Sequence, residues 1–195
     1  DALICKVDQV LTDLSTSLTD DATVQFLDGK SKDGHSVLLH STAHLMAQAV
    51  KRLYPKTKVT IGPYLENRFY YDFDVETPFT EQDLLKIEKE MLKISQENLE
   101  IVHEVKSRKE ALKFFKKIGE DYKVEIINDL DKSEVLKVYA QGDFTDLCRG
   151  PHVPSTGTIQ HFKLLSSSAA YWRGDENNQT LQRVYGTSFT SAKEL

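Results

Sequence analysis

The chain has 195 residues, of which 39% are hydrophobic and 28% charged, and its formal net charge at pH 7 is -5. This ordinary globular composition excludes a disordered chain, and the short apolar runs exclude a membrane-spanning segment. The negative net charge argues against binding nucleic acid through the overall field, although a local basic stretch can still dock phosphates. Two cysteines, Cys5 and Cys148, are too few for a disulfide framework, so we expect a soluble, intracellular protein with free thiols.

The first 30 residues are expected to form short strands and turns. The segment "KVDQVLTDLSTSLTDDATVQFLDG" mixes β-branched residues with Asp, Ser and Thr, which favour turns, and it ends at Gly29. We interpret this segment as part of a small β-rich unit.

From Ser36 the sequence predicts a helix that stops at Pro55. Its apolar residues gather on one arc at 100° per residue, and His40 and His44 fall on the opposite side. Residues four positions apart on a helix have Cβ atoms about 5 to 6 Å apart, so the two imidazoles can address one small object together. We therefore expect both histidines to face solvent or a cleft rather than the core.

The segment "VTIGPYLENRFYYDFDVE" predicts a β-hairpin that is rich in aromatic rings. Apolar and polar residues alternate in it around Gly62-Pro63 and Glu66-Asn67. A long amphipathic helix follows, capped by Thr80 with Asp83 in its third position. The buried stripe of this helix is expected to consist of Leu84, Ile87, Met91 and Ile94.

The middle of the chain carries a basic stretch, "VKSRKEALKFFKK", between a predicted strand "EIVHEV" and Gly119. Ser107 with Glu110 predicts a capped helix there, and Gly119 is its expected end. The basic residues form either a solvated helix face or a surface for phosphates. They are Lys106, Arg108, Lys109, Lys113, Lys116 and Lys117. The next segment, "DYKVEIINDL", is ambiguous between helix and strand.

The last third of the chain predicts several strands. "VLKVYAQGDFTDLC", "IQHFKLLSSSAAYWRG" and "QTLQRVYGTSF" are joined by Gly, Asp and Asn, which favour turns. Helices that alternate with adjacent hairpins indicate an α+β fold with a largely antiparallel sheet.

Cys148 and His152 in "TDLCRGPHVP" repeat the four-residue spacing of His40 and His44. If the fold brings both pairs together, three imidazoles and a thiol converge, a set suited to zinc or to general-base activation of water. A zinc protease of the H-x3-H type is disfavoured, because Ser41 occupies the position of its catalytic glutamate. A Cys148 nucleophile activated by histidine has weak support, since no family motif surrounds the cysteine. The spacing alone leaves zinc and a metal-free base open.

Several of these segments resemble a known family. "HSTAHLMAQAVKRLYP", "IGPYLENRFYYDFD", "DYKVEII" and the run from "DLCRGPH" to "LQRVYGTSF" are similar, in order and spacing, to the editing domain of threonyl-tRNA synthetase of the bacterial and organellar type. The resemblance implies an α+β editing domain over residues 31–188, preceded in 1–30 by the trailing part of a TGS-like β-grasp domain. Residues 189–195 would begin the linker to an aminoacylation domain.

The resemblance implies an aminoacyl-tRNA deacylase that hydrolyses mischarged seryl-tRNA(Thr). We expect a fragment of a threonine-tRNA ligase, an ATP-binding enzyme whose aminoacylation and anticodon-binding domains would be partners beside serine-charged tRNA(Thr). The alternatives are a free-standing deacylase that acts in trans, a zinc-binding editing domain of the alanyl type, a tRNA-binding module and a zinc-stabilised structural domain. The expected location is the cytoplasm, or the mitochondrion in a eukaryote, with no membrane partner.

The resemblance also implies which side chains form the site. It assigns water activation to His40 or His44, and stabilisation of the developing oxyanion or orientation of the substrate to Lys123. Asp146 would bind the seryl amine, His152 its hydroxyl, and Tyr71 would oppose the methyl group of threonine. No metal is expected, and zinc is the alternative. The implied catalytic residues are His40, His44, Lys123, Cys148 and His152, the substrate-binding residues are Tyr71 and Asp146, and the alternative zinc ligands are His40, His44, Cys148 and His152.

Overall fold

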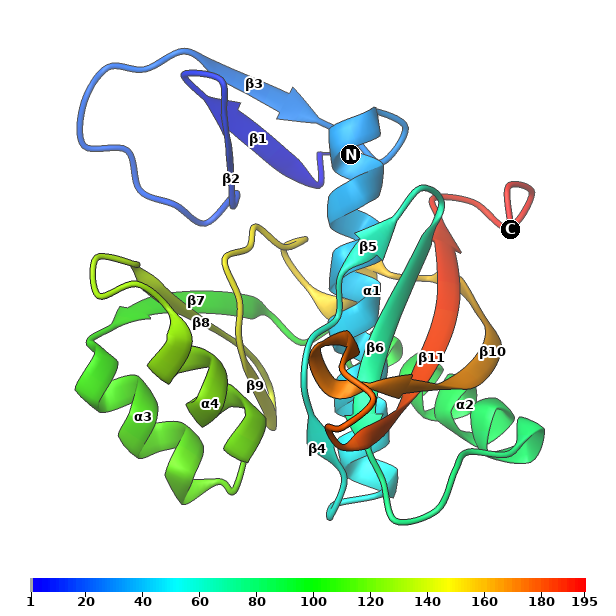
Figure 1. The fold of residues 1–195 in the computed structure, drawn as a ribbon. Helices are drawn as coiled ribbons and strands as arrows, with labels where there is room; N and C mark the ends of the chain where they lie inside the picture. Colours follow the sequence, from blue (N-terminus) through cyan, green and yellow to red (C-terminus); the bar gives the residue numbers. More distant parts are fainter. Residues whose placement is uncertain (1) are drawn as a thin grey trace.

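The computed structural model describes residues 2–195, and helix α1 (Lys32–Leu53) runs through the centre of this part of the chain (Figure 1). Its first turn is capped by Ser31, whose hydroxyl accepts the Gly34 N–H at 3.1 Å. The helix is therefore longer than predicted, because the cap lies before Ser36. No helix of the described residues combines the length and apolarity that crossing a bilayer requires.

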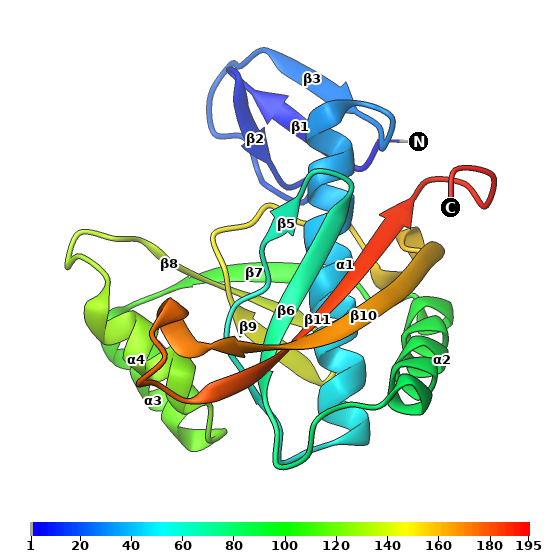
Figure 2. The same cartoon turned by 45° about the vertical axis from the view of Figure 1, so that its right-hand side comes forward.

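A five-stranded sheet packs against one side of α1, and Figure 2 shows its strands crossing the helix. Its strands pair in the order β10-β11-β6-β4, and β5 pairs with the N-terminal end of β6. Helix α2 (Glu81–Glu97) lies beside α1 and β10. The strands are β4 (Lys58–Val59), β5 (Tyr64–Leu65), β6 (Arg68–Asp74), β10 (His161–Tyr171) and β11 (Thr180–Phe189).

A smaller sheet in the order β7-β8-β9 approaches α1 through β9. Helices α3 (Arg108–Lys117) and α4 (Asp121–Asp129) connect β7 to β8 and pack on this sheet around a separate small core. The ambiguous segment "DYKVEIINDL" is thus helical. The strands are β7 (Ile101–Lys106), β8 (Leu136–Gln141) and β9 (Phe144–Leu147), and single 3-10 turns lie at Thr156–Thr158 and Trp172–Gly174.

The leading unit is a three-stranded sheet, β1 (Ile4–Val7), β2 (Val10–Thr12) and β3 (Val24–Leu27), in the order β2-β1-β3. This confirms the expected short strands before Gly29. All strand pairs of the described residues are antiparallel, which confirms the predicted α+β class. The proposed limits at residues 30 and 188 remain predictions.

Both predicted capping boxes are present. Thr80 and Asp83 cap α2, and Ser107 and Glu110 cap α3, each pair exchanging side-chain and backbone hydrogen bonds. The predicted stripe of α2 is buried as expected. Gly119, just beyond α3, has a φ of +76°, which favours glycine at a helix end.

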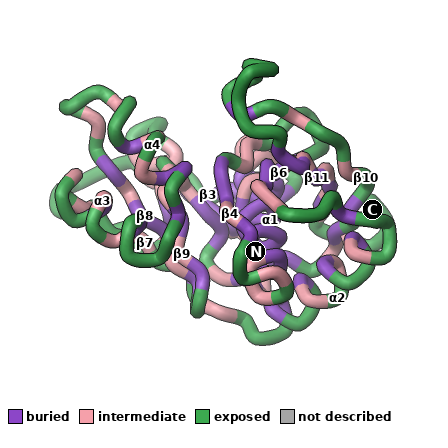
Figure 3. Tube along the Cα trace, turned by 60° about the horizontal axis from the view of Figure 1, so that its bottom comes forward, coloured by how far each residue is buried: buried purple, intermediate pink, exposed green. Residues whose placement is uncertain are grey.

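One expectation about α1 is wrong. Both histidines are expected to face solvent or a cleft, but His44 is only 3% exposed, whereas His40 remains partly exposed. The reason is that remote elements cover the polar face too, since β9 and the chain after it pack opposite the large sheet. Figure 3 shows buried positions concentrated along α1, β6 and β11 in the middle of the trace.

Candidate active site

The two pairs predicted from the sequence meet at the middle of α1. His40 and His44 come from α1, while Cys148 and His152 come from the loop that follows β9. One ligand-type atom of each residue lies within 4.8 Å of the corresponding atoms of the others. We call these four residues the soft cluster.

A glycine lets the second pair approach the first. Gly150 has a φ of +69°, and a Cβ at this position would lie 1.8 Å from the Tyr139 hydroxyl oxygen. Any larger residue would displace the loop or Tyr139, so Gly150 fixes the path that carries Cys148 and His152 toward α1.

His40 is held from both ring nitrogens. Its Nδ1 lies 3.1 Å from the carbonyl oxygen of Gly62, and its Nε2 lies 2.9 Å from Cys148 Sγ. The carbonyl can only accept, so Nδ1 carries the hydrogen, and the lone pair of Nε2 faces the thiol. The Gly150 N–H also donates to Cys148 Sγ at 3.2 Å. His40 is therefore arranged as an acceptor toward the cluster.

His152 presents a free nitrogen to the cluster. Its Nδ1 lies 2.9 Å from Ser41 Oγ, and Ser41 Oγ also accepts the Val153 N–H at 3.1 Å. Among the described residues His152 Nε2 has no hydrogen-bond partner, although the side chain is only 2% exposed. A buried polar atom without a partner is costly, so this nitrogen marks a place where a ligand group or water belongs.

A buried ion pair lies against the soft cluster. Lys123 Nζ of α4 lies 2.6 Å from Asp146 Oδ1 of β9, and their side chains are 2% and 1% exposed. Lys123 also donates to the Tyr71 hydroxyl at 3.2 Å and to the carbonyl of Thr60. The Tyr71 hydroxyl in turn donates to Asp146 Oδ2 at 2.8 Å. An ammonium group is thus fixed within a buried network in which each of its three N–H donors has a partner.

The ion pair is connected to the cluster through His44. His44 Nε2 lies 3.6 Å from Asp146 Oδ2, and the His44 ring lies 4.4 Å from the ring of His152 between their centroids. The stacked rings of His40 and His152 are 4.7 Å apart. Cation, carboxylate, imidazoles and thiol therefore form one continuous polar site.

Burial sets the protonation of the site. It lowers the pKa of His40 below 6.5, and it lowers the pKa of His44 and His152 well below that value, with the neighbouring imidazoles adding to the effect for the latter two. Burial raises the pKa of the Cys148 thiol to about 12 and that of Tyr71 well above 10. Near pH 7 the three imidazoles are neutral bases and the thiol is protonated.

This electrostatic environment disfavours Cys148 as a nucleophile. Thiolates, not thiols, attack carbonyls, and reactive cysteines have lowered pKa values. A neutral imidazole can accept a proton from water, and His40, whose pKa is lowered less than that of His44, suits this role better. The site can therefore deprotonate water beside a fixed cation.

The soft cluster also has the donor types of a zinc site. Tetrahedral zinc with Zn–N of 2.0–2.1 Å and Zn–S of about 2.3 Å holds its donors roughly 3.6 Å apart. His40 Nε2 and Cys148 Sγ, at 2.9 Å, are closer than that, so zinc would require these two to separate. His152 Nε2, buried and unpaired among the described residues, would suit a ligand role without such a change. The residues therefore fit zinc in kind, but His40 and Cys148 are too close together to hold it without moving.

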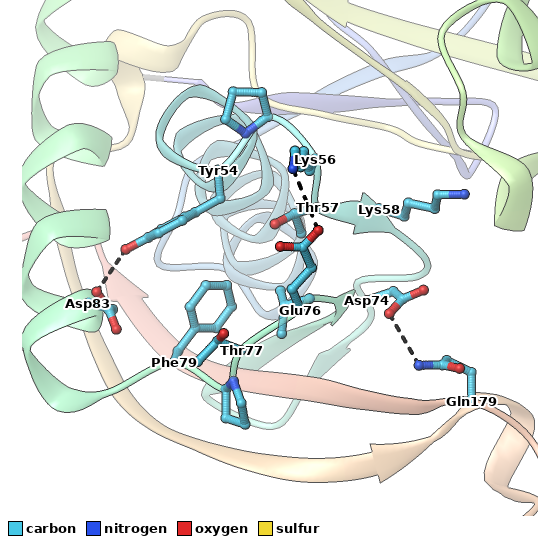
Figure 4. A pocket seen from close by; sticks show the side chains of 13 residues that line it. Tyr54, Lys56, Thr57, Lys58, Asp74, Glu76, Thr77, Phe79, Asp83 and Gln179 are labelled. Carbon is cyan, nitrogen blue, oxygen red and sulfur yellow. Dashed lines mark hydrogen bonds and ion pairs between the residues drawn. The ribbon is translucent and has the colours of Figure 1, made fainter.

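A cleft of about 820 Å³ lies elsewhere, at the C-terminal end of α1 (Figure 4), and its lining includes Tyr54, Lys56, Asp74, Glu76 and Asp83. A second cleft, of about 810 Å³, is lined in part by the first turns of α1. A much smaller cleft of about 140 Å³, lined in part by Cys148 and Arg149, lies beside the soft cluster. The candidate site therefore lies beside the small cleft and apart from the cleft at the C-terminal end of α1.

All seven residues predicted for the site lie in this one network, with Tyr71 and Asp146 joined to Lys123 and the soft cluster beside them. Their roles remain proposals. The sequence pattern did not indicate Ser41 as a partner of His152, because that position was informative only for its lack of a glutamate. It also did not indicate Gly62, whose contribution is a backbone carbonyl, or Asp13 in the leading unit.

Comparison with known proteins places this site in a family context. Residues 136–185 match the family described as "Threonyl and Alanyl tRNA synthetase second additional domain". Over 194 residues the chain is 55% identical to the threonine-tRNA ligase of Pelobacter propionicus, 54% to that of Symbiobacterium thermophilum and 52% to that of Coxiella burnetii. Each alignment covers 100% of this chain and 30% of the relative. These matches confirm the resemblance to the editing domain of threonyl-tRNA synthetase. The chain spans about 30% of the length of these relatives.

Proposed function

We propose that this chain, an editing domain of the threonyl-tRNA synthetase type, hydrolyses the ester that links serine to tRNA(Thr). The observation that carries the proposal is the convergence of neutral imidazoles, a buried ammonium and a His152 nitrogen that is unpaired among the described residues. The need for such a reaction is physical. Serine differs from threonine by one methyl group, which gives only about 1 to 3 kcal/mol of discrimination in a binding pocket.

His40 is the proposed base. Its Nδ1–H is held by the Gly62 carbonyl, which leaves Nε2 as the lone pair, and it is more accessible than His44. A water molecule would replace the thiol as the partner of Nε2 and lose its proton to it while the water oxygen attacks the ester carbonyl. The tetrahedral oxyanion then collapses, the bond to the ribose oxygen breaks, and the imidazolium returns the proton to that oxygen. The products are serine and uncharged tRNA.

The other polar groups would bind and orient the substrate. Lys123, fixed by Asp146 and Tyr71, would supply positive charge to the developing oxyanion. Asp146 would attract the seryl amine, and His152 Nε2 would contact the seryl hydroxyl. Tyr71, which is 0% exposed and rigidly bonded, would leave no room for the additional methyl of threonine. Rejection of threonine is thus proposed to arise from rigidity rather than from a charged group.

We propose that the reaction needs no metal. The support is the arrangement of His40 and Cys148, which are closer to each other than two ligands of one zinc ion. If zinc were held, His40, His44, Cys148 and His152 would bind it, and it would acidify a bound water. Metal analysis of the purified chain tests this, and one equivalent of zinc that is lost in the Cys148→Ala variant would contradict the metal-free proposal.

The partners follow from the relatives. We propose that these residues act within a longer threonine-tRNA ligase in the cytoplasm, where aminoacylation and anticodon-binding domains supply most of the tRNA docking surface. A free-standing deacylase acting in trans is the alternative. Comparing this chain with a full-length ligase on the same charged tRNA separates the two, since a fragment should bind tRNA more weakly.

The decisive experiment presents the chain with serine-charged and threonine-charged tRNA(Thr) in parallel. We expect rapid release of serine, slow release of threonine, and loss of serine release in the Lys123→Ala and His40→Ala variants. Lys89→Ala, on the exposed face of α2, is the matched control and should behave like the wild type. Equal release of both amino acids, or full activity of Lys123→Ala, would contradict the proposal.

A further inference from the structure

A carboxylate of the leading unit, the three-stranded sheet at the start of the chain, reaches the site. Asp13 follows β2 directly and is only 7% exposed. Its Oδ1 accepts the backbone N–H of His152 at 2.9 Å, and its Oδ2 accepts the Tyr139 hydroxyl at 2.7 Å. His103 Nδ1 lies 3.4 Å from Oδ2. Both oxygens of this buried carboxylate are thus used to bind the chain around His152.

Tyr139 extends the effect of Asp13 to the His152 ring. Tyr139 is 2% exposed, and its ring lies 4.5 Å from the ring of His152 in an edge-to-face arrangement. Its hydroxyl also lies where a side chain at residue 150 would have to be placed. Asp13 therefore fixes the backbone of His152 and the aromatic wall against which its imidazole packs.

The contacts divide the orientation of His152 between two distant segments. Ser41 of α1 holds Nδ1 of the ring, whereas Asp13 holds the backbone on the other side. The hydrogen bonds of a carboxylate are stronger than those of a neutral acceptor, so Asp13 restricts His152 more than a hydroxyl or carbonyl in its place would. With the ring and the backbone of His152 both held, its Nε2, which is unpaired among the described residues, can point in only one direction.

We propose that Asp13 is a positioning residue for His152, and that through it the leading unit completes the editing site. The role rests on the proposed function, because it matters for catalysis only if His152 contacts the substrate. Misplacing a substrate-contacting group by about 1 Å can slow a reaction by up to roughly 100-fold. We therefore expect Asp13→Ala to lower the single-turnover rate of serine release by about 10- to 100-fold.

The test uses the whole chain with three variants and one control. Asp13→Ala removes both hydrogen bonds, Asp13→Asn keeps an oxygen for the His152 N–H, and Tyr139→Phe removes only the hydroxyl contact. Asp20→Ala, a change of an exposed carboxylate in the same unit, is the matched control. For each variant we would measure the serine release rate, the melting temperature and the NMR signals of the His152 ring nitrogens.

We expect the rates to fall in the order wild type, Asp13→Asn, Asp13→Ala, with shifted His152 ring signals in Asp13→Ala and none in Asp20→Ala. A folded Asp13→Ala variant that releases serine at the wild-type rate overturns the proposal, whatever its spectrum. If Asp13→Ala does not fold, the same comparison is made with Asp13→Asn and Tyr139→Phe, and wild-type rates in both overturn it.

The NMR measurement separates this inference from the proposed function. A wild-type chain that releases no serine contradicts the function itself. His152 ring signals that shift in Asp13→Ala then still support the positioning contact, and unchanged signals in the folded variant overturn it.

Discussion

Helix α1 borders two very different regions, an open cleft at its C-terminal end and the soft cluster at its middle. The cleft at its C-terminal end is large and open, and its polar groups pair at the surface, as in the contact of 3.7 Å between Lys56 and Glu76, which are 86% and 80% exposed. The soft cluster at its middle is small and buried. The comparison shows that the candidate site lies where titratable groups are buried together, and not in this large open cleft.

The same interaction has different consequences in the two regions. In the cleft, solvent screens an ion pair, and its net contribution to stability is about 0 to 1 kcal/mol. In the site, Lys123 and Asp146 are almost fully removed from water, so neither can lose its partner without leaving a buried charge. The following predictions test this contrast.

The largest effect is expected for Lys123→Ala. Removing the ammonium leaves the Asp146 carboxylate buried without a cation beside it. This should lower the free energy of unfolding by about 3 to 5 kcal/mol. Serine release should be lost as well, because the oxyanion loses its cation. Urea unfolding and the release assay measure the two effects.

A double variant separates charge from packing in that result. Lys123→Met with Asp146→Asn removes both charges and keeps similar volumes, so it should recover much of the lost stability without recovering activity. A double variant as unstable as Lys123→Ala would show that packing, rather than the unpaired carboxylate, explains the loss.

The second effect concerns the base. His40→Ala should slow serine release by about 10²- to 10⁴-fold, the range that general-base catalysis contributes. Its effect on stability should be smaller than that of Lys123→Ala, since His40 is only partly buried and neutral. The control is His161→Ala, which removes an imidazole from β10 outside the site and should leave serine release unchanged. A His44→Ala variant that loses far more activity than His40→Ala would transfer the role of base to His44.

The third effect is a dependence of stability on pH. Burial lowers the pKa values of His44 and His152 well below 6.5 in the folded chain, so below pH 6.5 the unfolded chain binds protons that the folded chain does not. Stability is therefore fully present above pH 6.5 and falls as the pH decreases, by up to about 1.4 kcal/mol per pH unit for each histidine.

Urea unfolding at pH 7.5, 6.5 and 5.5 measures this slope. His44→Leu should reduce it, because one of the titrating groups is removed. Equal stability of the wild type at pH 7.5 and 5.5 would show that the imidazoles are not buried as neutral groups.

Features encoded by neighbouring residues could be predicted from the sequence. The capping boxes at Thr80 and Ser107 and the turn at Glu66-Asn67 depend on residues within three positions of one another, and the structure contains all of them. The pairing of His40 with His44 is local in the same sense. Periodicity and turn chemistry were sufficient for these.

Features that depend on remote residues could not be predicted in the same way. His40 and Cys148 are 108 positions apart, and only the resemblance to a family indicated that they meet. The burial of His44 depends on β9, and the nine-residue α4 that carries Lys123 is too short for its periodicity to decide between helix and strand. Asp13 gave no signal at all, because an isolated aspartate in a turn-rich segment is ordinary.

The smallest effect is expected in the cleft, for Lys56→Ala. Among residues 2–195 its one ion pair is long and exposed, so the free energy of unfolding should change by no more than about 0.5 kcal/mol. The serine release rate should equal that of the wild type, because the cleft residues are all different from those of the site. A slower rate at unchanged stability would instead indicate that tRNA passes along the cleft on its way to the soft cluster. The two regions would then differ in role, since the cleft would bind tRNA and the soft cluster would hydrolyse the ester.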